Sequence, residues 1–107
     1  MNKNDQMNKN AGKATAFLKS VAHKHRLMIL CHLCERPHSV GGLQALIPIS
    51  QPGLSGHLKR MYDEGLLARR REGQKVYYSL KGTHTKKIIG TLYDIFCKDN
   101  AEQQTQI

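Results

Sequence analysis

Three cysteines are the residues of this sequence with the most obvious chemical potential. Cys31 and Cys34 lie three residues apart, and Cys97 follows much later in the chain. A cysteine thiolate can attack a disulfide or polysulfide sulfur, and it can also bind a soft or borderline metal ion. Free cysteine is equally one of the most often buried residue types. Redox chemistry, metal binding and simple packing are therefore the three alternatives for these side chains.

A metal site built on the first two cysteines is only weakly indicated. Cys31 and Cys34, with His38 or another histidine, would offer the ligand types that zinc prefers, but a Cys-x-x-Cys pair on one straight helix is only half of a site. The odd number of cysteines argues against a framework of structural disulfides. No nucleophile and base, and no phosphate-binding loop, have the spacing that catalysis requires. We therefore predict neither an enzyme nor a bound cofactor.

The block Ser50–Leu80, SQPGLSGHLKRMYDEGLLARRREGQKVYYSL, carries the second kind of chemistry. It predicts a helix with an exposed polar face followed by a basic β-hairpin, which is the layout of a winged helix-turn-helix. The whole chain has 17 Lys and Arg against 8 Asp and Glu, a net charge of +9. A small basic domain with this layout indicates double-stranded DNA as the partner, although a basic face can also be merely solvated.

One face of the predicted helix is apolar and the other is free to meet DNA. Leu54, Leu58 and Met61 repeat at i, i+4 and i+7 and are expected to face the core. Gln51 and Ser55, on the other side and near the helix start, are the best candidates for base contacts. The remaining candidates would touch phosphates, line the groove wall or enter a minor groove from the hairpin tip. They are Gly56, His57, Lys59, Arg60, Arg70, Arg71 and Gln74.

The composition of this helix is unusual for a DNA reader. Pro52 is tolerated only in the first turn of a helix. If Pro52 is the first helical residue, Gln51 becomes the cap and loses its base contact. Gly53 and Gly56 each cost up to ~1 kcal/mol of helix stability and offer no side chain to DNA. We therefore expect part of the recognition to shift toward Ser55, His57 and the hairpin.

The rest of the chain is predicted to be one domain over residues 10–98, between a disordered N-terminal tail (1–9) and a flexible C-terminal tail (99–107). The expected fold class is mainly α with a β-hairpin wing, in the order α-α-α-α-β-β-α. The expected helices outside the block are a first over Gly12–Ala22, a second from about His25 to before Pro37, a third capped by Ser39, and a last over Thr85–Cys97.

Two apolar patterns say how these helices should pack. In the second helix, the positions at i, i+3, i+4 and i+7 are Leu27, Leu30, Cys31 and Cys34, which predicts a buried stripe. The last helix has an apolar arc too wide for a surface helix. We expect the first helix of the same chain and the last helix of a second chain to cover it, which gives a homodimer. The residues of the arc are Ile88, Ile89, Leu92, Tyr93, Ile95 and Phe96.

The sequence offers no feature of a membrane or exported protein. No apolar run approaches the ~20 residues of a membrane span. The N-terminal residues MNKNDQMNKN have no apolar core of a signal peptide. We expect a cytoplasmic protein of a prokaryote-like cell, with no membrane as a partner.

The runs VAHKHRLMILCHL, SV..LQALI and SQPGLSGHLKRMYDEGLLARRREGQKVYYSL resemble the ArsR/SmtB family of bacterial winged-helix repressors, over about residues 14–97. The resemblance implies a homodimeric repressor that leaves its operator DNA when an inducer binds. Arsenic sensors of the family carry a Cys-x-Cys-x-x-Cys motif, which this chain lacks. Zinc sensors use Asp and His along the last helix. Here His84 and Asp94 are ten residues apart, or about 280° past whole turns, so they do not share a face.

The stretches RLMILCHL and TLYDIFC resemble the thiol-sensing branch of the family, typified by BigR, SqrR and HlyU. That resemblance implies that Cys31 and Cys97 form the sensing pair. Reactive sulfur species or oxidants would join them through a disulfide or polysulfide bridge, and the repressor would release DNA. The resembled pair does not include Cys34, which we expect in the core. The alternatives are a metal-responsive (zinc- or cadmium-type) repressor of the same fold and a winged-helix module used only for protein contacts.

Overall fold

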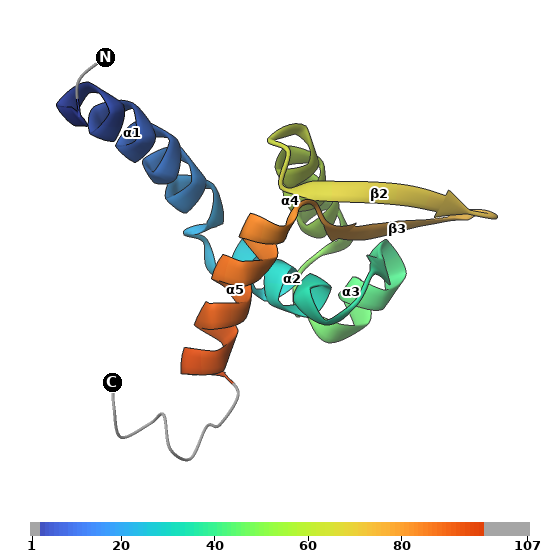
Figure 1. Cartoon of the computed structure of the whole chain (residues 1–107). Coiled ribbons are helices and arrows are strands. Elements are labelled where there is room, and N and C mark those ends of the chain that lie inside the picture. The colour runs from blue at the N-terminus through green and yellow to red at the C-terminus, as the bar shows by residue number, and fades with distance from the viewer. Residues whose placement is uncertain (1–2, 98–107) are drawn as a thin grey trace.

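The structure, a computed structural model, describes residues 3–97, which form five helices and one three-stranded antiparallel sheet (Figure 1). Strand β3 lies in the middle of the sheet, in the order β1-β3-β2. The predicted class, mainly helical with a β-hairpin wing, is confirmed. The elements are α1 (Lys3–Val21), α2 (Lys24–Glu35), β1 (His38–Ser39), α3 (Val40–Leu46), α4 (Gln51–Asp63), β2 (Leu67–Glu72), β3 (Lys75–Leu80) and α5 (Thr83–Phe96).

Local sequence signals set the ends of the central elements. The hydroxyl of Ser39 accepts a hydrogen bond from Gly42 N at the start of α3, as predicted. Helix α4 ends at Asp63, and Gly65, two residues later, has φ +83°. There the N–H of Gly65 and the N–H of the next residue bond back to carbonyls of the last turn, which is the Schellman pattern. The β2–β3 hairpin turns on two residues, with Gly73 at φ +63°.

Strand β1 was not predicted from the sequence. It is only two residues long, and it pairs with β3 through His38 opposite Tyr78 and Ser39 opposite Tyr77. Two residues carry no periodic signal, because a strand of that length is defined by its partner rather than by its own pattern. The pairing ties the segment between α2 and α3 to the base of the wing.

The stripe predicted for α2 is displaced by one position. The buried residues of this helix are Arg26, Ile29, Leu30 and Leu33, which again repeat at i, i+3, i+4 and i+7. The predicted stripe contains Cys31 and Cys34. Both are half-buried and lie at the edge of the observed buried stripe. The sequence analysis missed the true register because it excluded a charged residue, Arg26, from a core face.

The core lies where α2, α3, α4, the base of the wing and α5 meet. Leu54, Leu58 and Met61 are fully buried there, which confirms the predicted inner face of α4. On α5 the buried apolar residue is Ile89. The other members of the core are Val21, Ile29, Leu30, Leu33, Leu43, Ile47, Leu66, Leu67 and Tyr78.

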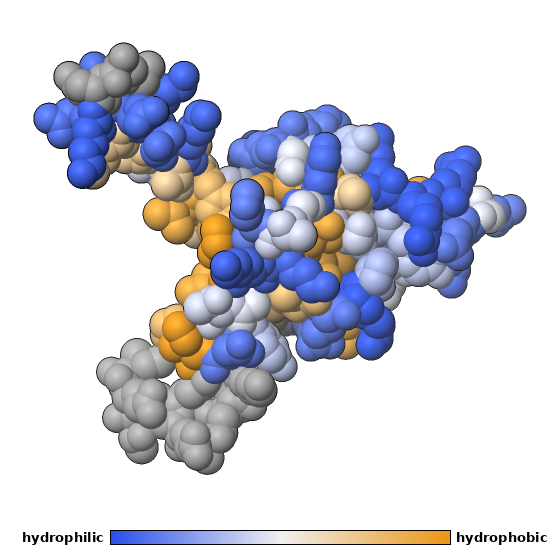
Figure 2. Space-filling model, viewed as in Figure 1, coloured by the Kyte–Doolittle hydropathy of each residue, from blue (hydrophilic) through white to orange (hydrophobic). Residues whose placement is uncertain are grey.

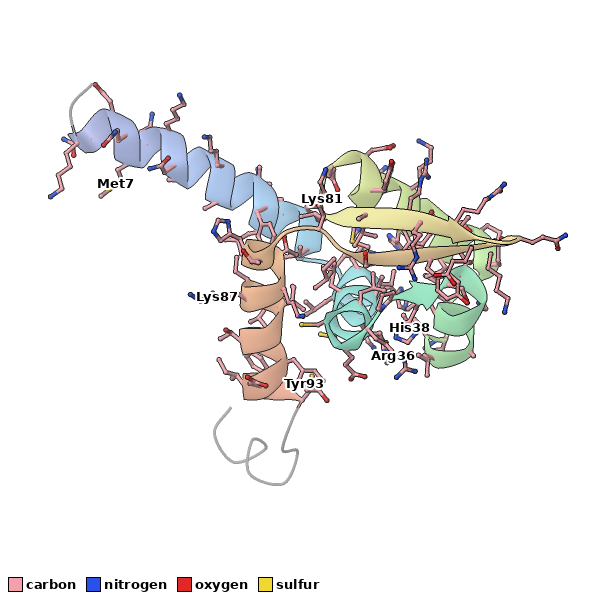
Figure 3. All side chains as sticks on the ribbon, turned by 45° about the vertical axis from the view of Figure 1, so that its right-hand side comes forward. Met7, Arg36, His38, Lys81, Lys87 and Tyr93 are labelled. Atoms are coloured by element: carbon pink, nitrogen blue, oxygen red, sulfur yellow. The ribbon has the colours of Figure 1, made fainter. Side chains whose placement is uncertain are left out.

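Helix α1 differs most from expectation. It begins at Lys3 rather than Gly12, so residues 3–9, which were expected in a disordered tail, are helical. Figure 1 shows α1 projecting away from the rest of the chain, and Figure 3 places Met7 on its outer part. It does not cover α5 within one chain, and the predicted apolar arc stays partly open, with Phe96 52% exposed. The C-terminal tail predicted for 99–107 lies outside the described residues.

No helix within residues 3–97 is both long enough and apolar enough to cross a membrane.

One glycine inside α4 and one just after its end provide a matched test of this local geometry. A Cβ added at Gly56 or at Gly65 would meet no atom within 4 Å, so the two differ in backbone conformation and not in space. Gly56 is inside α4, whereas Gly65 has φ +83°. We expect Gly65→Ala to lower the free energy of unfolding by about 1–2 kcal/mol. We expect Gly56→Ala to raise it by about 0.5–1 kcal/mol.

The measurement is urea unfolding followed by circular dichroism at one fixed protein concentration. Equal effects of the two substitutions would contradict the assigned end of α4.

Candidate nucleic-acid interface and thiol site

The start of α4 is held by Ser50 and not by Gln51. The Ser50 hydroxyl accepts a hydrogen bond from Gly53 N at 3.2 Å, and Pro52 is the second helical residue, where its missing N–H costs nothing. Gln51 is therefore the first helical residue, is exposed, and is not the cap. Its Nε2 donates to Ser55 Oγ at 2.8 Å. The two predicted base readers thus lie side by side on the outer part of the helix.

His57 lies differently from the other candidate contacts, because its ring is turned inward. His57 Nδ1 accepts a hydrogen bond from Arg26 Nε at 3.2 Å, and the ring is half-buried against His23, with centroids 4.6 Å apart. Burial, followed by the neighbouring His23 and Arg26, holds the pKa of His57 below its usual range. Position 57 is three residues after Leu54 and four before Met61, so the apolar spacing itself could have placed it at the edge of the buried face.

Arg26, which links α2 to α1 and α4, is the positioning residue that the sequence analysis missed. Only 9% of it is exposed. Its Nη1 donates to the Ser20 carbonyl at 3.0 Å and lies 4.0 Å from a carboxylate oxygen of Glu64. The Ser20 hydroxyl donates to the same Glu64 oxygen at 2.7 Å. This cluster, Ser20, Arg26, His57 and Glu64, joins the end of α1, the start of α2 and both the middle and the end of α4.

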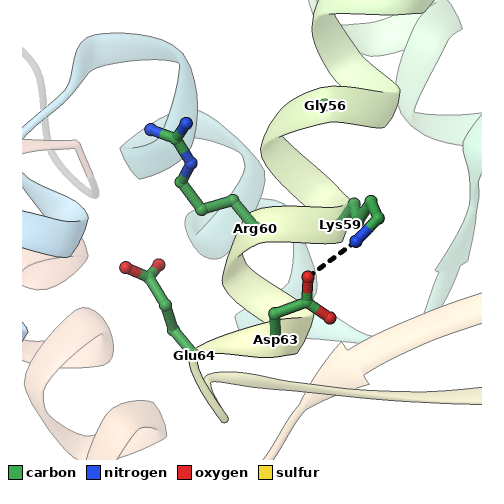
Figure 4. A pocket seen from close by; sticks show the side chains of 5 residues that line it. All are labelled: Gly56, Lys59, Arg60, Asp63 and Glu64. Atoms are coloured by element: carbon green, nitrogen blue, oxygen red, sulfur yellow. Dashed lines mark hydrogen bonds and ion pairs between the residues drawn. The ribbon is translucent and has the colours of Figure 1, made fainter.

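The outer face of α4 also carries two basic residues near its C-terminal end (Figure 4). Lys59 pairs with Asp63 one turn later, at 2.8 Å. Arg60 is exposed and extends on the other side of the helix, the side of Glu64. Both side chains are mostly solvated, so the Lys59–Asp63 pair contributes little to stability. Either cation could therefore exchange its present surroundings for a phosphate at small cost.

The three arginines of β2 have different surroundings. Arg69 lies over the ring of Tyr62, 3.9 Å from its centroid, and so packs against α4. Arg70 pairs with Glu72 at 2.6 Å. Arg71 is exposed next to the turn, and within residues 3–97 no ion pair or hydrogen bond holds its side chain. Gln74 is exposed in the turn itself. Of the wing residues predicted to contact DNA, Arg71 and Gln74 are the ones most available to a ligand.

Cys31 and Cys97 line one hollow of about 350 Å³ between α2 and the C-terminal end of α5. Cys31 is half-buried, whereas Cys97, the residue directly after α5, is exposed. Figure 3 labels Tyr93, which lines the same hollow from α5. The other lining residues are Lys24, Leu27, Met28, His32 and Glu35. The structure thus brings together two cysteines that are far apart in the sequence.

The Cys31 thiol is protonated at neutral pH. Burial, followed by the charges of Cys97, Cys34 and Glu35, raises the pKa of Cys31 to about 11. Since the thiolate is the nucleophile, Cys31 is a poor attacking group in this state.

Cys34 packs against α5 and does not line the hollow with the other two. Its Sγ lies 3.6 Å from the Lys86 carbonyl, and a Cβ added at Gly90 would come within 3.7 Å of the sulfur. Gly90 therefore lets α2 and α5 approach closely at this point. These contacts agree with the core role expected for Cys34.

Within residues 3–97, the one group of three or more potential metal ligands is His23, His25 and His57. Neither the Cys31–Cys34 pair nor His84 belongs to it. The sequence analysis did not find this group, because its members come from the α1–α2 junction and from the middle of α4.

The helix pair α3–α4, followed by a β-hairpin with an exposed arginine at its tip, defines a winged helix-turn-helix DNA-binding protein. The family described as bacterial regulatory protein, arsR family, matches residues 23–69. The chain is 40% identical to the transcriptional activator HlyU of Vibrio cholerae over 95 residues, which is 89% of this chain and 88% of that protein. The chain therefore belongs to the ArsR family of transcription regulators.

Solved structures agree with this assignment. Reduced HlyU from Vibrio cholerae superimposes with a TM-score of 0.83 at 40% identity, covering 87% of this chain and 98% of that one. The repressor BigR from Xylella fastidiosa gives 0.82 at 35% identity, covering 89% and 94%. The protein is thus a DNA-binding transcription regulator and not an enzyme. This family assignment favours DNA binding over the alternative of a winged helix used only for protein contacts.

Arg69 and Arg71 allow the wing to be tested with a matched pair. Each arginine that neutralises a phosphate releases counterions, so its loss reduces the slope of log K against log salt by about 1. We expect Arg71→Ala to weaken duplex binding and to reduce the slope by about this amount. We expect Arg69→Ala to leave the slope unchanged, because Arg69 is stacked on Tyr62. Fluorescence anisotropy between about 50 and 200 mM salt measures both.

The same slope for Arg71→Ala and the unsubstituted protein would contradict a phosphate contact at the wing tip.

Proposed function

We propose that this protein is a dimeric transcriptional repressor that senses reactive sulfur species or oxidants through Cys31 and Cys97 and then releases its operator. The observation that carries the proposal is the shared hollow, because two thiols with no proximity in the sequence line one small cavity. The hollow is lined partly by Leu27, Met28 and Tyr93, and such a surface suits sulfane sulfur, which is soft and weakly hydrated. As a bacterial regulator, the protein would act in the cytoplasm, where its operator lies.

The relatives bear on two parts of this proposal, repression and thiol oxidation. BigR is described as a repressor, and one HlyU structure is described as reduced. HlyU itself is named a transcriptional activator. We choose repression because BigR, which is 35% identical to this chain over 89% of its length, is described as a transcriptional repressor.

The unequal surroundings of the two cysteines indicate an order of reaction. Cys97 is exposed and is the first attacking group, whereas the pKa of about 11 keeps Cys31 as a thiol. The Cys97 thiolate attacks a sulfane sulfur of a polysulfide, and the remainder of the polysulfide leaves as an anion. Cys31 then loses its proton and attacks the sulfur chain now carried by Cys97, and HS⁻ leaves.

The product depends on which sulfur Cys31 attacks. Attack on Cys97 Sγ gives a disulfide, and attack on an inner transferred sulfur gives a bridge that retains one or more sulfur atoms. A direct disulfide needs Cα atoms roughly 4.4–6.8 Å apart. Retained sulfur spans a wider separation, which would favour polysulfide over peroxide as the inducer.

Operator binding is proposed for the outer face of α4 and for the wing tip. Gln51 and Ser55 would meet base edges, and the cations would meet phosphate. His57 is the exception among the candidates, since its Nδ1 already accepts from Arg26. The residues proposed to contact operator DNA are Gln51, Ser55, Gly56, Lys59, Arg60, Arg70, Arg71 and Gln74.

A gel shift on the DNA upstream of the protein's own gene tests the thiol mechanism. We expect polysulfide to release the unsubstituted protein from DNA and a reductant to restore binding. We expect Cys31→Ser and Cys97→Ser to bind DNA normally but to stay bound with polysulfide present. Cys34→Ser is the matched control, because Cys34 packs on α5 outside the hollow, and it should release normally.

Normal release by Cys31→Ser or by Cys97→Ser would refute the proposed pair. Mass spectrometry of the released protein should show a bridge between residues 31 and 97 within one chain.

The dimer rests on the apolar surface that one chain leaves open. Figure 2 shows apolar surface at the base of α1 and on α5. Leu18 of α1 is 57% exposed, and Ile95 of α5 is 49% exposed. Large side chains of this kind on two projecting helices are costly in water and indicate a protein interface. ArsR-family regulators typically bind operators as dimers, and a second copy of this chain offers the same two helices.

Light scattering on a sizing column tests the interface. We expect a mass of about 24 kDa, twice the 12.1 kDa of one chain. The double substitution Ile88→Glu with Ile95→Glu should give a mass near that of one chain, because it places charge in the apolar face. Lys87→Glu is the control, about 100° around the helix from Ile88, and should remain dimeric. A single-chain mass for the unsubstituted protein would contradict the dimer.

A further inference from the structure

Three imidazoles meet where the α1–α2 junction touches the recognition helix. His23 and His25 flank the start of α2, and His57 comes from the middle of α4. One ring nitrogen from each lies within 4.8 Å of the others. The ring centroids of His23 and His57 are 4.6 Å apart, and those of His25 and His57 are 6.4 Å apart. Neither the thiol mechanism nor the proposed DNA contacts use this cluster.

We propose that His23, His25 and His57 form a binding site for one divalent ion of the zinc class. Three histidines with a fourth position open to water are an established ligand set for Zn²⁺, at Zn–N distances of about 2.0–2.1 Å. A tetrahedral ion of that size needs the three nitrogens closer together than their present spacing. His23 is exposed and His25 is half-buried, so an ion can approach both rings from solvent, and there is room for the rings to turn toward it.

The donor set selects the class of ion. All three ligands are imidazole nitrogens, which suit Zn²⁺, Co²⁺, Ni²⁺ and Cu²⁺. Ca²⁺ and Mg²⁺ prefer oxygen donors, and the group contains no carboxylate. It contains no cysteine either, so this site is chemically separate from the thiol pair.

Ion binding would compete with two hydrogen bonds. His23 Nδ1 accepts from His25 N at 3.2 Å and thereby caps α2, and His57 Nδ1 accepts from Arg26 Nε at 3.2 Å. A neutral ring with Nδ1 as an acceptor carries its proton on Nε2. The ion must therefore displace the donor at Nδ1, or bind Nε2 after the proton has moved to Nδ1. Both routes break the two bonds.

The consequence is a link between the ion and the position of α4. Loss of the Arg26–His57 hydrogen bond removes one contact between α2 and the recognition helix. The ion replaces it with a metal-mediated link from His23 and His25 at the α1–α2 junction to His57. Arg26 keeps its bond to the Ser20 carbonyl and stays near Glu64. The Glu64 carboxylate also offsets part of the repulsion between the guanidinium and a bound cation.

The test uses the untagged full chain with all three cysteines replaced by serine, so that thiols cannot bind the ion. Zn²⁺ is titrated at pH 7.5 in competition with a chromophoric chelator. We expect one Zn²⁺ per chain. We expect the further substitution His23→Asn to weaken binding by at least about 100-fold, since even outer partners of metal ligands are worth 10–100-fold. Asparagine keeps the cap of α2, so the helix start survives the loss of the imidazole.

His25→Asn should weaken binding to the same degree, and His84→Asn is the matched control that should not change it, because His84 is exposed on α5 outside the group. Nitrogen NMR of the imidazoles gives an independent reading, with Zn²⁺ shifting the signals of the three site histidines and leaving that of His84 in place. No stoichiometric binding by the cysteine-free chain, or unchanged affinity in His23→Asn, would overturn the proposal.

Discussion

The burial of the Arg26 guanidinium is the constraint on which the arrangement of the DNA-reading half depends. A buried charge costs several kcal/mol unless its hydrogen bonds and counter-charge are supplied. Here the Ser20 carbonyl, His57 Nδ1 and the Glu64 carboxylate supply them. Those partners come from α1 and from α4, so satisfying one charge fixes where the first helix ends and how the recognition helix lies against α2.

The same helix also reaches the proposed sensor. Cys31 follows Arg26 by five residues, or about 140° around α2 after whole turns. One face of α2 therefore holds α4, and another face meets α5 across the hollow that Cys97 lines. A rigid helix with these two attachments can transmit a change at the thiols to the helix that carries Gln51 and Ser55. No longer pathway is needed, because the two attachments are about one and a half helical turns apart.

The parts of the structure that the sequence predicted are those fixed by local chemistry. Ser39 caps α3, Gly65 follows the end of α4 and Gly73 lies in the hairpin turn. In each case a hydroxyl or a missing Cβ of the residue itself determines the local conformation. The parts it missed depend on partners far along the chain. Arg26 looks like a surface residue until Ser20 and Glu64 are placed beside it.

The candidate site divides in the same way. The outer face of α4 follows from the spacing of Leu54, Leu58 and Met61, whereas the inward turn of His57 follows from a partner 31 residues away. The pairing of Cys31 with Cys97 was predicted from a resemblance and not from any pattern, because no periodicity relates position 31 to position 97. The length of α1 was missed because its polar residues gave no apolar stripe to count.

Energetics limits what a thiol bridge can do to DNA binding. To turn a population from 99:1 to 1:99, an input must favour one state by about 5.5 kcal/mol. A bridge supplies that bias only as the strain it would store in the DNA-bound arrangement of α2 and α5, and distorted disulfides store several kcal/mol. A dimer would hold two bridges acting on one pair of recognition helices, so their strains add. A bridge with retained sulfur has more rotatable bonds and stores less strain at a given separation. The bridge must therefore be long enough to form across the separation of Cys31 and Cys97 and still short enough to strain the DNA-bound arrangement, so the number of retained sulfur atoms sets the response.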